Sequence, residues 1–343
     1  MPNFTPMILV TGGTGLVGTH LLMDLLNYET PIRAIYRSDN ALEKVRKIFA
    51  FYNIKWEQTL HKIEWIKSDL LNTEVLIDAF KNVEYVYHCA AMVSFNKADK
   101  TKLFKVNIEG TANVVNLSLA CGVKKFCHVS STATIGKAKK DGIRDEDCIW
   151  ENDGSFSNYS ISKYFSEMEV WRGSEEGLNV VIVNPSIIIG PGNWMQSSSN
   201  LFLKVWKGLR YYSKGMNAFV DVRDVSKAMV ELMKSSVTSE RFLIIGENLT
   251  FQDLFNEIAI SLGKRIPFIE VKSWMASLIW RIEALRSFLF GSDPLVTKES
   301  SKSALSIVKY SNNKIKAQLN FKTTPINQSI AHTSKIFLQD YSE

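Results

Sequence analysis

Cysteine is scarce in this chain, and its few copies are not spaced for a metal site or a disulfide framework. The 343 residues include four cysteines, and none of them shows CxxC spacing or has a histidine at ligand spacing. They are Cys89, Cys121, Cys127 and Cys148. Zinc sites and disulfide-stapled folds need such spacings. We therefore expect no bound metal and a reducing, cytoplasmic environment.

The sequence also lacks the segments that carry a chain into or across a membrane. Only six residues precede the first apolar strand, which leaves no room for a cleavable signal peptide. The uncharged stretch 180–203 contains Pro185, Gly190 and Pro191, so it cannot form a spanning helix. We expect a soluble protein without a transmembrane segment.

No basic run with interleaved aromatic residues is present, which argues against a nucleic-acid partner. The net charge of +6 is nevertheless uneven, because residues 271–343 hold ten Lys or Arg against five Asp or Glu. This basic end is either a solvated face or a surface that attracts an anionic substrate or a membrane.

Short β-branched runs alternate with amphipathic stretches over the first half of the chain. The expected buried strands cover 7–11, 31–36, 63–67, 85–89, 125–130 and 179–184. The helical patterns between them cover 17–26, 41–51, 74–80, 103–121 and 159–174. This alternation predicts an α/β fold with a doubly wound parallel (Rossmann) sheet.

After Pro185 the rhythm changes, and a smaller, interleaved C-terminal substrate lobe is expected. A short extended piece at 219–221, a helix from Asp224 and a strand at 241–245 lead to helices at 251–262, 273–290 and 327–340. We assign 1–184 to the dinucleotide-binding domain, with 218–248 returning to it, and 185–217 and 249–343 to the substrate-binding lobe.

A glycine-rich turn follows the first strand and reads both as GxGxxG and as TGxxGxxG. Its glycines allow a tight turn and close approach of a pyrophosphate, and the helix that follows directs its N-terminal N–H groups at the phosphates. The predicted cofactor contacts here are Gly12, Thr14, Gly15, Leu16, Val17 and Gly18.

Arg37 ends the second strand, 19 residues after Gly18, where an NAD enzyme places an acid on the ribose 2′-hydroxyl. An arginine there can donate two hydrogen bonds to a 2′-phosphate, so NADP(H) is favoured over NAD(H) as the cofactor. Asp39 is the opposing signal and keeps NAD(H) possible. Asp69, after the third strand, is placed to touch the adenine amino group or to cap a helix.

Tyr159 and Lys163 stand four residues apart, so both side chains lie on one side of a helix. A free phenol loses its proton near pH 10, and a neighbouring ammonium together with the positive nicotinamide ring is expected to lower that pKa. The phenol can then give a proton to a carbonyl oxygen as hydride reaches the carbon. Thr132 is the first choice and Ser131 the second for a hydroxyl that orients the substrate oxygen.

An ordered set of motifs resembles the extended short-chain dehydrogenases/reductases over nearly the whole chain. It comprises TGGTGLVG, Ser68-Asp69-Leu70, His88-Cys89-Ala90-Ala91, Val106-Asn107-Ile108-Glu109-Gly110-Thr111, Ser130-Ser131-Thr132, Tyr159-Ser-Ile-Ser-Lys163 and Asn184-Pro-Ser-Ile-Ile-Ile-Gly-Pro191. The resemblance implies Thr132, Tyr159 and Lys163 as the catalytic trio, with Asn107 kinking its helix and holding a water.

The same resemblance implies further cofactor contacts. Lys163 would grip the nicotinamide ribose, and Pro185 with Ser186 would lie against the nicotinamide. The remaining implied contacts are Leu70, Ala90, Ala91 and Ser130.

Within this family the dihydroflavonol-reductase and 3β-hydroxysteroid-dehydrogenase branches look most similar, which implies an NADP(H)-dependent reductase of ketones, aldehydes or β-keto acyl compounds. The alternatives are an NAD-dependent sugar-nucleotide epimerase and a nonenzymatic nucleotide sensor. A stock of aromatic residues beyond Pro185 favours a hydrophobic carbonyl substrate. The 273–290 helix has four interpretations: packing on the lobe, which we favour, a lid, a homodimer surface or a helix that touches lipid.

Overall fold

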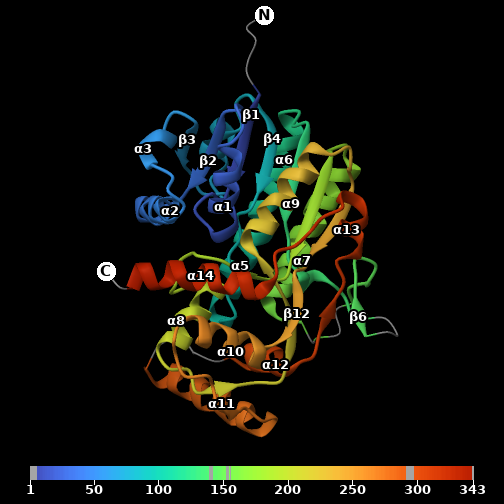
Figure 1. Cartoon of the computed structure of the whole chain (residues 1–343). Coiled ribbons are helices and arrows are strands. Elements are labelled where there is room, and N and C mark those ends of the chain that lie inside the picture. The colour runs from blue at the N-terminus through green and yellow to red at the C-terminus, as the bar shows by residue number, and fades with distance from the viewer. Residues whose placement is uncertain (1–5, 139–141, 152–153, 155, 291–296, 342–343) are drawn as a thin grey trace, which may run out of the picture.

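The computed structural model describes residues 6–138, 142–151, 154, 156–290 and 297–341. Seven parallel strands form its central sheet, in the order β11-β7-β5-β4-β1-β2-β3 (Figure 1). Their bounds are β1 Met7–Thr11, β2 Ile32–Tyr36, β3 Ile63–Lys67, β4 Val83–His88, β5 Lys125–Val129, β7 Val180–Pro185 and β11 Glu240–Ile244. The predicted doubly wound α/β fold is confirmed, and strand bounds differ from those expected by one or two residues.

Helices cover both faces of this sheet. On one face lie α1 (Leu16–Leu25), α2 (Asp39–Phe51) and α9 (Val222–Lys234), and on the other α4 (Thr73–Ala79), α6 (Gly110–Ala120) and α7 (Asn158–Glu175). Successive strand residues enter opposite cores, as Val10 and Leu9 do in β1. Strands buried on both faces explain the continuous apolar runs in the sequence.

The predicted helix at 103–121 begins earlier and is not uniform. It consists of α5 (Lys100–Phe104), a π-helical segment η2 (Lys105–Glu109) and α6. A π-segment widens the helix by one residue per turn, which turns Asn107 into the interior.

A second lobe is built on a three-stranded sheet, β12 (Glu247–Thr250), β10 (Met216–Asp221) and β8 (Ile187–Ile189). Its core packs α8 (Asn200–Trp206), α10 (Phe251–Ser261) and α14 (Ile326–Tyr341) against this sheet. The chain interleaves the two lobes: α9 and β11 belong with the large sheet, whereas β10, which overlaps the start of the segment 218–248, pairs in the small one. The domain division of the sequence stays a proposal.

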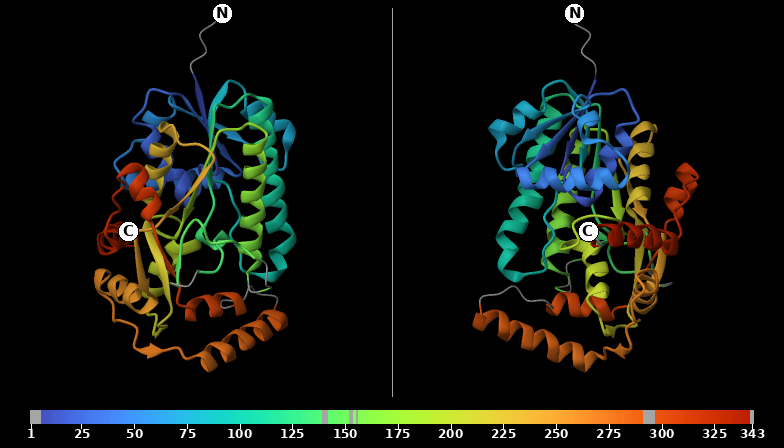
Figure 2. Two further views of the ribbon diagram at one scale, coloured as in Figure 1. Left: turned by 90° about the vertical axis from the view of Figure 1, so that its right-hand side faces the viewer. Right: turned by 60° about the vertical axis from the view of Figure 1, so that its left-hand side comes forward.

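The remaining elements are short or lie at one end of the molecule. The short ones are α3 Trp56–Thr59, η1 Lys97–Asp99, η3 Thr132–Thr134, β6 Ile143–Arg144, η4 Ser197–Ser199, β9 Tyr211–Tyr212, β13 Ile269–Glu270, β14 Lys309–Tyr310 and α13 Asn313–Leu319. At the end opposite the N-terminus lies α11 (Ser273–Phe290), with α12 (Lys298–Leu305) between it and the rest of the molecule (Figure 2).

Packing on the lobe, the interpretation favoured for 273–290, is wrong for one side of α11. Trp274, Leu278 and Ile282 are each more than half exposed, because α12 packs on the other side, near Ala276. Leu285 and Leu289, which continue the pattern in the sequence, have side chains outside the described set. Among the described helices, none has the length and apolarity needed to span a bilayer.

Candidate active site

The glycine-rich turn between β1 and α1 is shaped so that only glycine fits at two positions. Gly12 has φ +68°, and a Cβ there would lie 2.6 Å from the Ala90 backbone. A Cβ on Gly18 would lie 2.2 Å from the carbonyl oxygen of Gly12. Helix α1 begins after Gly15 without a side-chain cap, so its first N–H groups are left for a ligand. These features fit the pyrophosphate of a dinucleotide.

A small cavity lies beside the carboxyl ends of β2 and β3. Arg37, Lys67 and Asp69 are among its lining residues. The Arg37 side chain is exposed and has no ion pair within the described chain, whereas Asp39 is paired with the Lys67 ammonium at 2.8 Å. Asp69 accepts the N–H of Leu71 at 2.9 Å with one carboxylate oxygen. The predicted opposing signal, Asp39, is therefore already engaged by a cation.

The other predicted cofactor contacts follow the same edge of the sheet. The N–H of Ala90 lies 3.4 Å from the Thr11 hydroxyl, and Leu70 is buried against Gly110. Pro185 ends β7 and Ser186, also buried, bonds to the Ile244 carbonyl. Four more predicted contacts follow closely after β1 and β4: Thr14, Leu16, Val17 and Ala91.

Tyr159 lies in the first turn of α7, near the carboxyl end of β5. The side chain of Ser131 lies beside this phenol, and the Tyr159 ring lies 5.6 Å from that of Phe95. Thr132, the first choice from the sequence, is buried and lies close to Tyr310. Both residues stand at the carboxyl end of β5, so the choice of Thr132 over Ser131 stays a prediction.

Lys163 lies one turn beyond Tyr159 and is 1% exposed. Its ammonium donates to the Val129 carbonyl at 2.8 Å, which holds it at the end of β5. Burial lowers the pKa of Lys163 to about 8, while the Glu167 carboxylate acts in the opposite direction. The ammonium is therefore poised to titrate close to neutral pH.

The expected lowering of the Tyr159 pKa includes the effect of the bound nicotinamide ring and stays a prediction. Burial raises the pKa of this phenol, and the Ser131 side chain only partly opposes the rise. The sequence argument counted on the Lys163 ammonium, but in the structure that group is directed to the Val129 carbonyl.

Asn107 joins three parts of the site from the π-helical segment η2. Its Oδ1 accepts the Met92 N–H at 2.7 Å, and its Nδ2 donates to the Met92 carbonyl and to the Ser162 hydroxyl, both at 3.0 Å. The helix irregularity at Asn107 agrees with the kink that the resemblance implied. The water-holding role stays a prediction.

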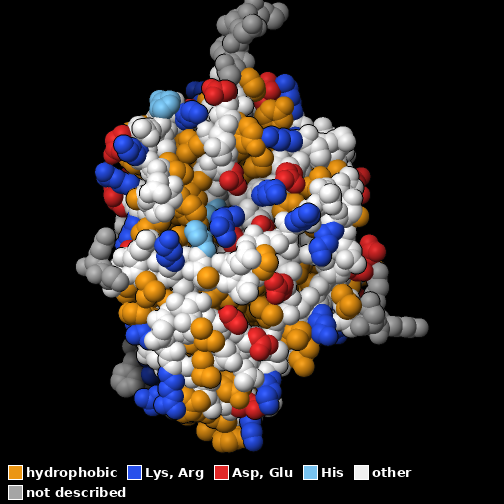
Figure 3. Space-filling view, in the orientation of Figure 1, with side chains coloured by type: hydrophobic (Ala, Val, Ile, Leu, Met, Phe, Trp, Pro, Cys, Tyr) orange, Lys and Arg blue, Asp and Glu red, His pale blue; other side chains and the backbone are white. Residues whose placement is uncertain are grey.

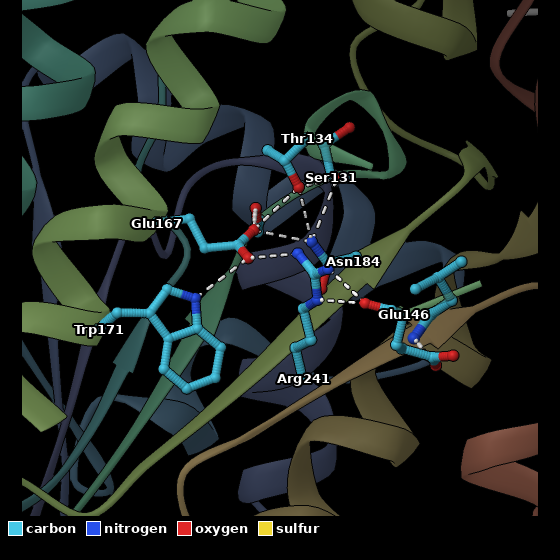
Figure 4. Close-up of polar contacts among 9 residues, drawn as sticks. Ser131, Thr134, Glu146, Glu167, Trp171, Asn184 and Arg241 are labelled. Atoms are coloured by element: carbon cyan, nitrogen blue, oxygen red, sulfur yellow. Dashed lines mark hydrogen bonds and ion pairs between the residues drawn. The ribbon is translucent and has the colours of Figure 1, made fainter. Parts of the chain in front are cut away.

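The buried carboxylate of Glu167 is hydrogen-bonded to side chains around the carboxyl end of β5. Glu167, one turn after Lys163, is completely buried and accepts from the Ser130 hydroxyl at 2.5 Å and from Asn184 Nδ2 at 2.9 Å. The Arg241 guanidinium, from β11, lies 3.2 Å from Glu167 and also donates to the Glu146 backbone (Figure 4). The hydroxyl of Ser130, a predicted cofactor contact, is therefore hydrogen-bonded within this network.

Sequence reasoning missed Glu167 and Arg241 in this network, whereas Ser130 was expected as a cofactor contact. The step of four residues from Lys163 to Glu167 was visible and would have placed both on one side of α7. Arg241 and Tyr310 carry no such signal, because only the interleaved second half of the chain brings them to the β5 end.

Comparison with known proteins supports the same class. The model of the NAD dependent epimerase/dehydratase family matches residues 8–246. A protein named putative dihydroflavonol 4-reductase from Synechocystis is 26% identical, covering 94% of this chain and 92% of its own. The chain belongs to the NAD dependent epimerase/dehydratase family and is an NAD(P)-dependent enzyme of the extended short-chain dehydrogenases/reductases.

Two further similarities bear on the branch. Sterol demethylase protein B of Methylococcus capsulatus is 30% identical over 77% of this chain and 76% of its own. The solved UDP-glucose 4-epimerase of Thermotoga maritima superposes with a TM-score of 0.76 at 20% identity, covering 98% of this chain and 99% of that one. At that identity the second similarity shows the fold alone.

Proposed function

We propose that the protein is an NADP(H)-dependent reductase that converts a hydrophobic ketone, aldehyde or β-keto acyl compound to an alcohol. The observation that carries this proposal is the placement of Tyr159 beside the Ser131 side chain at the carboxyl edge of the sheet, with the buried Lys163 ammonium one turn away. Substrates of doubly wound folds bind at this edge.

The bound dinucleotide supplies the hydride that reaches the carbonyl carbon. The chain's own groups act on the carbonyl oxygen: the Ser131 and Tyr159 hydroxyls hold it, and Tyr159 transfers its proton to the oxygen. The Lys163 ammonium stabilises the phenolate that remains until Tyr159 regains a proton from solvent. Thr132, the first choice from the sequence, stands at the same strand end and is the alternative to Ser131 for holding the oxygen.

Apolar surface next to Tyr159 supports the choice of a hydrophobic substrate. Phe95 packs beside the phenol, and Val93 and Phe95 remain 50% and 42% exposed. Covering such surface gives about 25 cal/mol per Å². The relatives named for dihydroflavonol and sterol chemistry support the same substrate class.

One assay separates this proposal from its alternatives. Purified protein is mixed with NADPH or NADH and a panel of aromatic, aliphatic and sterol ketones, aldehydes and β-keto thioesters, and coenzyme absorbance is followed. We expect NADPH oxidation with at least one apolar carbonyl. Tightly held NAD with interconversion of sugar nucleotides would favour the epimerase, and coenzyme binding without any turnover would favour a sensor.

Replacing Arg37 with alanine is expected to raise KM for NADPH by about tenfold or more, with KM for NADH nearly unchanged, because a charge-assisted contact to the 2′-phosphate is worth about 1.5–3 kcal/mol. Steady-state kinetics with both coenzymes measures the effect. Arg46→Ala, on the exposed side of α2 and paired with Glu57, is the matched control. Equal changes for both coenzymes would contradict the assignment.

Carbonyl reduction is expected to slow above about pH 8. The pKa of Lys163 is lowered to about 8, so the ammonium is present below that pH and is lost as pH rises through it. Burial keeps Tyr159 protonated over the same range, because its pKa is raised. The measurement is kcat/KM against pH, and Lys163→Met should lack this alkaline decline. A decline that persists in the variant would assign it to another group.

A further inference from the structure

We propose that the exposed side of α11 docks the protein reversibly on the surface of an anionic membrane. The apolar face of α11 consists of Trp274, Leu278 and Ile282, which are 66%, 52% and 56% exposed. Steps of four residues put the three side chains on one side of the helix, and the buried Ala276 marks the opposite side. A tryptophan beside aliphatic residues suits the boundary between headgroups and acyl chains.

The segment that leads into α11 extends this apolar surface. Ile266 and Phe268 are 47% and 50% exposed, and the Arg265 guanidinium lies 4.2 Å from the Phe268 ring. At this end of the molecule, Figure 3 shows hydrophobic side chains gathered together and flanked by Lys and Arg. An amphipathic arrangement of this kind can lie in the plane of a bilayer surface.

The charges around this face match an anionic surface. Residues 264–302 contain seven Lys or Arg against four Asp or Glu. Lys272 and Arg281 flank the apolar face and have no carboxylate partner within the described chain, and Arg281 instead bonds to the Ser277 carbonyl at 2.8 Å. Basic residues near a membrane that carries anionic lipid strengthen the attraction to it.

A second copy of the chain fits this face less well than lipid does. A stable interface buries about 800 Å² on each partner, so a dimer would need contacts beyond the five exposed apolar side chains of this surface. Two copies facing each other through α11 would also bring their uncompensated cations together. Anionic headgroups match the same cations while acyl chains cover the apolar side chains.

The test uses the full chain and vesicles of two compositions, phosphatidylcholine alone and phosphatidylcholine mixed with phosphatidylserine. Co-sedimentation is measured for the unchanged protein, for the double variant Leu278→Gln/Ile282→Gln, and for Ile77→Gln as the matched control. Ile77 is 51% exposed on α4, a helix that packs on the large sheet, so its loss should be neutral. Circular dichroism and NADPH binding check that each variant is folded.

We expect binding to the phosphatidylserine vesicles that weakens with added salt and falls at least about tenfold in the double variant, since each removed side chain loses apolar burial. The Ile77→Gln variant should bind as the unchanged protein does. Equal binding by all three proteins, or no preference for phosphatidylserine, would overturn the proposal. So would a homodimer that the double variant dissociates, because the face would then be a self-association surface.

Discussion

Replacement of Tyr159 by phenylalanine is expected to lower kcat for carbonyl reduction by about a thousandfold, because the proton donor is lost while the ring remains. The Ser131 side chain, which lies beside Tyr159, can still hold the carbonyl oxygen. NADPH binding, followed by its fluorescence, should be nearly unchanged.

The matched control for this prediction is Tyr164→Phe, one turn further along α7. The Tyr164 ring stacks on Trp150 with centroids 3.9 Å apart, an arrangement that phenylalanine preserves. Its kcat should stay close to that of the unchanged enzyme. Substantial activity in Tyr159→Phe would show that another group donates the proton.

Removal of the Glu167 carboxylate is expected to change both stability and pH dependence. Glu167→Ala removes the carboxylate to which the Arg241 guanidinium and the Ser130 hydroxyl donate. Breaking a buried ion pair typically costs about 3–5 kcal/mol in the free energy of unfolding. Glu167→Gln keeps an acceptor oxygen and should lose less. Urea unfolding followed by circular dichroism measures both.

The pH profile separates an electrostatic role of Glu167 from a purely structural one. Its charge raises the pKa of Lys163, so Glu167→Gln should lower that pKa and move the alkaline decline of kcat/KM to lower pH. Glu169→Gln, on the same helix and paired with Arg172 near the surface, is the control for both measurements. A normal pH profile in a folded Glu167→Gln enzyme would leave Glu167 with a packing role alone.

The sheet and the dinucleotide turn were predictable from sequence because their signals are local. Strands buried on both faces appear as apolar runs, and the Gly12–Gly18 turn needs glycine for steric reasons that spacing reveals. Helical spacing likewise placed Tyr159 and Lys163 on one side of α7. These features depend on residues within a few positions of one another.

What the sequence did not predict depends on contacts between distant segments. The neighbour of Thr132, Tyr310, comes from β14, far along the chain. The pKa of Tyr159 is decided by burial, which no spacing encodes. The exposure of Trp274 was missed because its pattern of apolar residues is the same whether a helix faces a core or the outside.

The interleaved path of the chain also limits how this enzyme can be re-engineered. Because β8 and β10 belong to the small sheet while α9 and β11 return to the large one, the substrate lobe is not a single contiguous insertion. Transplanting it between homologues would require several simultaneous splice points. Altered substrate choice is therefore easier to reach by individual side-chain changes around Phe95 and Tyr159 than by exchanging whole segments.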